Sequence, residues 1–236
     1  MVKYGGSAME DPAKVTEILR EIAGLAAEGY SLVLVHGGGK EISAELTRRG
    51  MKAVFAGGFR VTDISAMAVV EEGLDRKVNP GIVSQLNGLG CKARGISGRQ
   101  VFHATKAPKA DGVDLGRVGE VERCSVETVR KCLETKETAV VSPAGQGNDG
   151  GAMNLNADVA AAALAGSTSP RPTIVENRAS PAASVQPALR LFVCAPQSHN
   201  STTLVGVALS WIECLDPDSR LSFAQSKPSG PALLWS

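Results

Sequence analysis

Apolar residues recur at helical spacing near the start of the chain, at Val15, Ile18, Leu19, Ile22 and Leu25. This period predicts an amphipathic helix. Asp11 followed by Pro12 is typical of a helix start, with the aspartate as N-cap and the proline at the first helical position. Gly29 is expected to end the helix, because glycine adopts the left-handed backbone that often follows a last turn.

Residues 31–35 (SLVLV) form a short apolar run without polar alternation. Such a run predicts a strand buried on both faces of a parallel sheet. A glycine turn follows at 36–39, and helical character resumes at 41–49. The alternation returns in a predicted strand at 136–142 and a predicted helix at 158–164. Strands and helices that alternate in this way indicate an α/β fold, with a mostly parallel sheet and helices on both faces.

The composition changes sharply near residue 166. Of the 26 glycines, 24 precede this point, whereas 8 of the 12 prolines follow it. Residues 167–236 show no strand and helix rhythm. We therefore divide the chain into a domain at 1–166 and a divergent tail at 167–236.

Charge and composition exclude several classes of function. A net charge of +1 and an aromatic content of 4% disfavour a nucleic-acid partner, which needs basic patches and stacking platforms. No run of 18 apolar residues predicts a membrane span. Five widely spaced cysteines without a CxxC pair favour a reducing compartment over a disulfide or zinc framework. We expect a soluble, cytoplasmic protein without a metal-ligating set.

Two glycine segments could face phosphate groups. In 36–39 (HGGG) the glycines allow close backbone approach, and free N–H groups at the start of the next helix attract anions. A plain tight turn explains this segment equally well. Lys3 stands before Gly5 and Gly6 at the end of a predicted first strand, where its ammonium could meet phosphate oxygens. An ordinary solvated lysine is the simpler interpretation.

Two further segments carry polar chemistry. Arg60 in 57–63 (GGFRVTD) could bind a carboxylate through two parallel hydrogen bonds, or could form a structural ion pair with Asp63. Asn154 and Asp158 stand just before an alanine-rich helix, where a helix cap is as reasonable as a binding site. Residues 145–150 match the GxGxxG pattern, but no apolar helix begins at the third glycine. We interpret that segment as a loop and not as a dinucleotide site.

These four segments occur in an order that resembles the N-acetylglutamate kinases of the amino-acid kinase family. Residues 77–79 (KVN), 95–98 (GISG) and 114–121 (DLGRVGEV) also look like segments of that family. The match covers about residues 1–166. It implies an open αβα sandwich in which ATP phosphorylates the side-chain carboxylate of N-acetyl-L-glutamate, a step of arginine biosynthesis. It also implies a homodimer formed through the N-terminal domain.

The resemblance assigns roles to residues at matching positions. Lys3 would neutralise the phosphoryl oxygens, and Asp158 would orient lysine ammonium groups. Backbone N–H groups at Gly6, Gly38 and Gly39 would surround the phosphoryl group and the substrate. Arg60 would bind the α-carboxylate, and Asn154 the amide and carboxylate region. Magnesium would arrive with ATP, and no tightly bound cofactor is implied.

The sequence departs from the family pattern in three places. Only two residues precede Lys3, an Asp-Gly pair expected after 95–98 is missing, and we find neither an ATP-binding half nor a second catalytic lysine in 167–236. Two other functions therefore stay open. One is a kinase for a related acylated acidic amino acid, such as an aminoadipate derivative. The other is a non-catalytic, ligand-binding or dimerising fragment.

Overall fold

A computed structural model describes residues 1–5, 9 and 11–168 of the chain. The tail at 167–236 lies outside the described residues except for Ser167 and Thr168, which belong to the last helix described. In the part of the chain that is described, no helix is long and apolar enough to cross a bilayer.

The first half of the described chain contains β1 (Val2–Tyr4), α1 (Pro12–Ala27), β2 (Val33–His36), α2 (Gly39–Arg48), β3 (Val54–Ala56), β4 (Phe59–Val61), α3 (Ile64–Glu72), the π-helical η2 (Gly73–Val78) and α4 (Asn79–Gly88). The second half contains β5 (Ala93–Ile96), the 3-10 turn η3 (Gly98–Gln100), β6 (Phe102–Lys106), β7 (Val118–Cys124), α5 (Glu127–Glu134), β8 (Thr138–Val141), β9 (Ala144–Gly147), β10 (Ala152–Leu155) and α6 (Ala157–Thr168).

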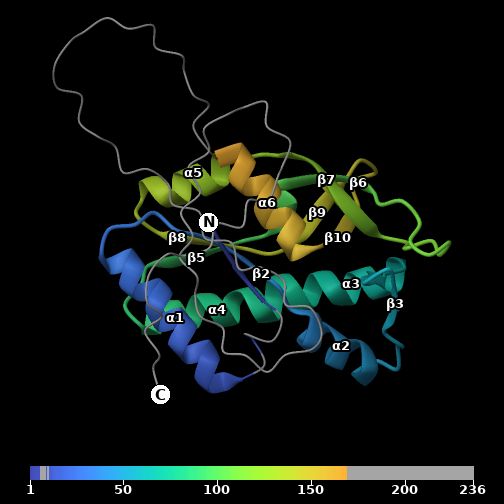
Figure 1. Cartoon of the computed structure of the whole chain (residues 1–236), viewed down its shortest axis with the longest axis horizontal. Coiled ribbons are helices and arrows are strands. Elements are labelled where there is room, and N and C mark those ends of the chain that lie inside the picture. The colour runs from blue at the N-terminus through green and yellow to red at the C-terminus, as the bar shows by residue number, and fades with distance from the viewer. Residues whose placement is uncertain (6–8, 10, 169–236) are drawn as a thin grey trace, which may run out of the picture.

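The central sheet has four strands in the order β1-β2-β8-β5, and every neighbouring pair is parallel. Figure 1 shows α5 and α6 on one side of this sheet and α1 and α4 on the other. Two helical layers therefore enclose one parallel sheet, and the αβα sandwich expected from the sequence is confirmed.

Strand β2 and the residue before it supply apolar side chains to both sides of the sheet. Leu32 and Leu34 pack in the core formed with α1 and α4, whereas Val33 and Val35 pack in the core formed with α5 and α6. All four are at most 2% exposed. Burying such a side chain contributes about 1.5–3 kcal/mol, so the uninterrupted apolar run predicted from the sequence anchors both layers at once.

The predicted boundaries of α1 are also confirmed by its capping. The Asp11 side chain accepts a hydrogen bond from the Ala13 N–H, with Pro12 at the first helical position. Gly29 adopts a positive φ of 93° directly after the helix. Leu19 and Ile22 of this helix are buried against the sheet.

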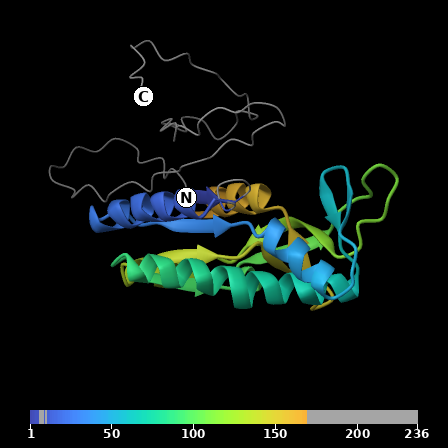
Figure 2. The same ribbon diagram turned by 90° about the horizontal axis from the view of Figure 1, so that it is seen from below.

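A second group of strands was not predicted from the sequence. Strands β10, β7, β6 and β9 form a small closed barrel, and β3 pairs with β4 as a separate hairpin. Residues 145–147 belong to β9, and only the second half of this GxGxxG match lies in the turn between β9 and the antiparallel β10. The loop interpretation is therefore wrong for the first half of the match and right for the second. Figure 2 shows the β3–β4 hairpin projecting beside the loop between β6 and β7, where the Gly57 N–H donates to Asp111 at 2.8 Å.

We predict that a methyl group at Gly98 destabilises the fold. A Cβ at this position would overlap the backbone carbonyl oxygens of Ser142 and Ala144, which have little freedom to move. Gly98→Ala should therefore lower the free energy of unfolding by about 2 kcal/mol or more, measured by urea denaturation.

Gly81→Ala in α4 is the matched control. A Cβ there would meet nothing within 4 Å, and alanine favours a helix interior by about 0.5–1 kcal/mol over glycine. Equal stability changes in the two variants would contradict the close packing at Gly98.

Candidate active site

The carboxyl ends of the four parallel strands meet at one edge of the central sheet. β1 and β2 each lead into glycine turns there, and the Gly37 N–H donates to the Tyr4 carbonyl at 2.7 Å. A Cβ on Gly5 would lie 3.1 Å from the Gly37 nitrogen, so the two turns touch through their backbones. In open α/β sheets, ligands bind at this edge.

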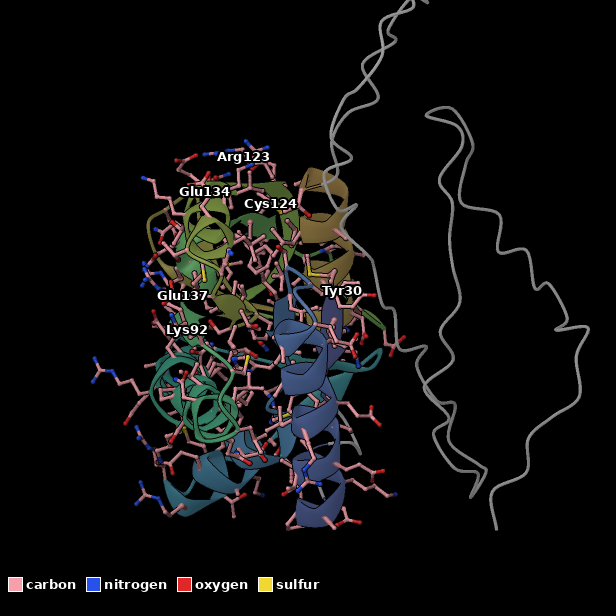
Figure 3. The ribbon with its side chains drawn as sticks, turned by 90° about the vertical axis from the view of Figure 1, so that its left-hand side faces the viewer. Tyr30, Lys92, Arg123, Cys124, Glu134 and Glu137 are labelled. Atoms are coloured by element: carbon pink, nitrogen blue, oxygen red, sulfur yellow. The ribbon has the colours of Figure 1, made fainter. Side chains whose placement is uncertain are left out.

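Figure 3 views the opposite end of the molecule. Its labels Tyr30, Lys92 and Glu137 mark residues that precede β2, β5 and β8, so this is the amino end of the sheet. The predicted site residues that the structure describes lie on other segments: Lys3 in β1, Gly38 and Gly39 at the start of α2, Arg60 in β4, Asn154 in β10 and Asp158 in α6.

Helix α2 begins at the edge where the strands end. Gly38 is its N-cap residue and, as a glycine, supplies no side chain to cap the first turn. The backbone N–H groups of a first turn have no partner within the helix and carry a partial positive charge, which makes them suited to an anion. A Cβ on Gly38 would lie 3.1 Å from Leu74, so the turn packs closely on η2. These observations agree with the predicted binding roles of Gly38 and Gly39.

The far end of α2 is tied to the rest of the domain by ion pairs. Glu45 accepts from Arg48 and Arg49 of the same segment and from Lys77 of η2, the last at 2.8 Å. The hydrogen bonds from these three cations hold the pKa of Glu45 well below its usual range. The direction in which the N-terminus of α2 points is therefore constrained by its opposite end.

Lys3 and Asp158, predicted from separate segments, form an ion pair. Tyr4 packs in the core with α1 and α4, so strand alternation directs Lys3 to the other side of the sheet, where α6 lies. The Lys3 Nζ is 3.0 Å from an Asp158 oxygen, with side chains 16% and 46% exposed respectively. An ammonium has three donors, so the pair orients Lys3 without using all its capacity for an anion.

The residue that caps α6 is neither Asn154 nor Asp158, the two candidates from the sequence. Asn156 Oδ1 accepts from the N–H of Asp158 at 2.8 Å and of Val159 at 3.3 Å. Asn156 is therefore the N-cap, Asp158 lies in the first turn with its side chain directed to Lys3, and Asn154 lies in β10. The segment therefore does cap the helix, but through Asn156, which had no predicted role.

Arg60 is a buried cation on β4. Its side chain is held by Gly39 O at 2.9 Å and Ser43 Oγ at 2.8 Å, both bonds being donated by Nη2. The guanidinium carbon lies 4.7 Å from the centre of the Phe55 ring. Nη1 is buried and has no hydrogen-bond partner among the residues that the structure describes. Burial lowers the pKa of the guanidinium below its usual value.

The ion pair between Arg60 and Asp63, which the sequence offered as an alternative to ligand binding, is not observed. Asp63 instead caps α3, where its carboxylate accepts from the Ala66 N–H and the Ser65 hydroxyl. Among the described residues no carboxylate pairs with Arg60. A buried donor without a partner is costly, so Nη1 is a position at which a ligand carboxylate would be stabilising.

Asn154 is joined to the arginine strand through Thr62. The Asn154 amide donates to Thr62 Oγ1 at 3.2 Å, and that hydroxyl donates to the Arg60 carbonyl at 2.8 Å. Thr62 is fully buried. Sequence reasoning gave no role to Thr62, although it lies inside the GGFRVTD segment. The structure thus connects Asn154 with Arg60, and Arg60 with Gly39, whereas Gly6 lies outside the described residues.

His36 supports the glycine turn from beneath. It is fully buried, its Nδ1–H donates to Gly37 O at 2.6 Å, and its Nε2 accepts from Asn79 at 3.1 Å. Burial lowers its pKa to about 4, although the Gly37 bond and the charge of Asp75 oppose that shift. The imidazole is therefore neutral near pH 7 and serves the turn through hydrogen bonds alone.

Asp75 is a further polar residue that the sequence did not indicate. Its two oxygens accept from Ser97 Oγ at 2.6 Å and Ser142 Oγ at 2.5 Å. It thus joins η2 to the residues that follow β5 and β8. The signal available in the sequence was the GISG segment, which contains Ser97 but does not reveal its partner.

Comparison with known proteins agrees with this arrangement. The model of the amino acid kinase family matches residues 1–175. The chain belongs to the amino acid kinase family. The acetylglutamate kinase of Akkermansia muciniphila is 39% identical over 170 residues, and that of a serogroup C, serotype 2a strain of Neisseria meningitidis is 42% identical over 172 residues. Each match covers 70% of this chain and 57% of the relative, so this amino acid kinase chain spans little more than half the length of either enzyme.

Solved structures support the same fold. The structure of smu.665 from Streptococcus mutans UA159 matches with a TM-score of 0.62 and 26% identity, over 70% of this chain and 66% of that one. N-acetylglutamate synthase from Neisseria gonorrhoeae, solved with coenzyme A and N-acetyl-glutamate, matches with a TM-score of 0.57 and 20% identity, over 70% and 38% of the two chains. The latter shows a shared fold alone.

We predict that His36 makes the stability of this amino acid kinase domain depend on pH. Because its pKa is about 4 in the folded state and about 6.5 when unfolded, the unfolded chain binds the extra proton first as the pH falls. The contribution of His36 is complete above pH 6.5 and declines by about 3 kcal/mol on acidification to pH 4.

Urea unfolding of the wild type and of His36→Gln between pH 4 and 7 measures this difference. His103→Gln, which removes a histidine of β6 away from the glycine turn, is the control for the loss of an imidazole. An NMR titration of the wild type gives the folded-state pKa directly. A midpoint near 6.5 for His36 would refute the prediction even if the variant did not fold.

Proposed function

We propose that this chain carries the substrate-binding part of an acetylglutamate kinase, which transfers the γ-phosphoryl group of ATP to the side-chain carboxylate of N-acetyl-L-glutamate. The observation that carries the proposal is the Lys3–Asp158 pair at 3.0 Å, beside the sheet edge where two glycine turns meet. Relatives about 40% identical to the chain bear the name acetylglutamate kinase, which supports this choice among amino acid kinases.

The charges present suit a reaction between two anions. A carboxylate that attacks a polyphosphate needs positioning and charge neutralisation, and little help from a general base. In this proposal Lys3 neutralises the phosphoryl oxygens while Asp158 holds its ammonium in place. The N–H groups at Gly38 and Gly39 face the phosphoryl group and the substrate. Gly6 is proposed for the same task from the sequence alone.

The other end of the substrate meets Arg60 and Asn154. Arg60 is already desolvated and has one donor without a partner, so an α-carboxylate would satisfy Nη1 in a region shielded from water. Asn154 is proposed to bind the amide and carboxylate region through the amide oxygen that its bond to Thr62 leaves available. The hydrogen bonds through Thr62 would hold Asn154 and Arg60 at fixed positions relative to the substrate.

The remaining assignments are proposed from the family resemblance and the composition of the sequence. ATP is proposed to enter with magnesium as one substrate complex, whose metal would help neutralise the phosphate charges. The proposed setting is arginine biosynthesis in the cytoplasm, with homodimers formed through residues 1–166. No nucleic acid, membrane or metal site of the chain's own is part of the proposal.

Two other functions are tested by the same experiments. A kinase for an aminoadipate derivative would differ by one methylene in the substrate, a difference usually worth only 1–3 kcal/mol. A non-catalytic, ligand-binding fragment is favoured by the chain's coverage of only 57% of its relatives' length. Such a fragment would bind N-acetylglutamate without binding ATP.

We predict that Asp158→Asn abolishes phosphoryl transfer while it leaves the fold intact. The amide keeps the shape of the side chain but cannot hold the Lys3 ammonium through charge. A half-exposed ion pair contributes only about 0–1 kcal/mol to stability, so the unfolding transition should move little. Phosphoryl transfer is measured by trapping the acyl phosphate with hydroxylamine.

Asn156→Ala is the matched control two residues earlier. It removes the cap of α6, so it should cost about 1 kcal/mol of stability and retain turnover. Retained turnover in Asp158→Asn would refute the catalytic assignment. Absence of turnover in the wild-type chain, with N-acetylglutamate binding preserved, would favour the non-catalytic fragment.

We predict that Arg60→Ala weakens N-acetylglutamate binding by about 2–5 kcal/mol, as expected for removing one member of a desolvated charge pair. ATP binding should change far less, because Arg60 is assigned to the other substrate. Isothermal titration calorimetry measures both. The control is Arg94→Ala. It removes an exposed arginine of β5 that pairs with Glu137. Equal losses for the two ligands would contradict the assignment.

A further inference from the structure

Both hydrogen bonds that fix the Arg60 guanidinium go to the N-terminal half of α2. Nη2 donates to Gly39 O and to Ser43 Oγ. The Ser43 hydroxyl also donates to Gly39 O at 2.7 Å. One hydroxyl therefore acts as acceptor for the arginine and as donor to the carbonyl that the arginine also uses.

This triangle decides which arginine nitrogen is left for a ligand. Nη2 donates two hydrogen bonds, and the guanidinium carbon lies 4.7 Å from the centre of the Phe55 ring, so the orientation of the fork is fixed. Within the described part of the chain, Nη1 is buried without a partner. Without the serine hydroxyl, Nη2 would keep one bond to Gly39 O, and the guanidinium could turn about it. A misdirected donor loses most of its value, since hydrogen bonds weaken steeply away from linearity.

We propose that Ser43 is a positioning residue, which holds Arg60 so that Nη1 is presented to the α-carboxylate of the acyl amino acid. The proposal rests on the function proposed above. Ser43 does not touch the substrate in this scheme. Through its bonds to Arg60 and to the Gly39 carbonyl, Ser43 connects the α-carboxylate site with the start of α2. The N–H groups proposed to face the phosphoryl group lie in that same part of the helix, so one helix end would position both ends of the substrate.

The chain contains a matched control on the same helix. Thr47, one turn later, makes the same kind of local bond, from its Oγ1 to the Ser43 carbonyl at 2.9 Å. It is exposed, and the hydrogen bonds of Arg60 go to Gly39 and Ser43 instead. Thr47→Ala and Ser43→Ala therefore remove comparable bonds to the helix backbone, and only one of them removes a partner of the arginine.

The experiment uses the full-length chain and two ligands. N-acetyl-L-glutamate carries the α-carboxylate, whereas 4-acetamidobutyrate keeps the acetamido group and the other carboxylate but lacks it. NMR titration gives Kd values for the wild type, Ser43→Ala, Ser43→Thr and Thr47→Ala. Ser43→Ala should weaken N-acetylglutamate binding by about five- to tenfold and leave 4-acetamidobutyrate unchanged. Ser43→Thr should restore binding, because threonine can bond the same carbonyl in a helix.

The outcomes separate this proposal from the one on which it rests. Equal weakening of both ligands, equal effects of Ser43→Ala and Thr47→Ala, or failure of threonine to restore binding would each overturn the positioning role. If the wild type does not bind N-acetylglutamate, or if Arg60→Ala binds it normally, the proposed function fails and this inference fails with it.

Discussion

The arrangement of this domain depends on one constraint, the burial of β2 between two helical layers. Leu32 and Leu34 face α1 and α4, and Val33 and Val35 face α5 and α6. A strand covered on both faces is stable when its neighbours are parallel and connected by helices. That connection brings the carboxyl ends of β1, β2, β5 and β8 to one edge, so the position of the site follows from how the core is buried.

At that edge the backbone supplies N–H groups and a few side chains supply charge. Neutral His36 and the glycine turns arrange N–H groups, and Lys3 and Arg60 supply positive charge from two different strands. Each cation is oriented by residues from a helix, Asp158 of α6 in one case and Ser43 of α2 in the other. Positive charge is therefore placed in advance, which suits a site for two anionic groups that repel one another.

Local signals predicted much of this correctly. The Asp11-Pro12 start and the Gly29 end of α1 and the buried β2 strand could all be inferred from neighbours in the chain, whereas residues 145–147, interpreted as loop, belong to β9. The β3–β4 hairpin and the small barrel of β6, β7, β9 and β10 could not. Their strands are only three to seven residues long, too short to show a clear period. In the barrel, β10 also pairs with β7 and β6 with β9, which are distant in sequence.

The same division applies to the site. The sequence by itself determined which residue types were available and that Lys3, Gly38, Gly39, Arg60, Asn154 and Asp158 stand near predicted turns and helix starts. Only the tertiary structure decided that Asp158 meets Lys3 while Asn156 caps α6, that Asp63 caps α3 and leaves Arg60 without a carboxylate, and that Ser43 holds Arg60. The two caps are local contacts, but each segment offered more than one role for its polar residues. The pairs Lys3–Asp158 and Arg60–Ser43 depend on packing that brings separate segments within about 3 Å, and a linear pattern carries no information about such distances.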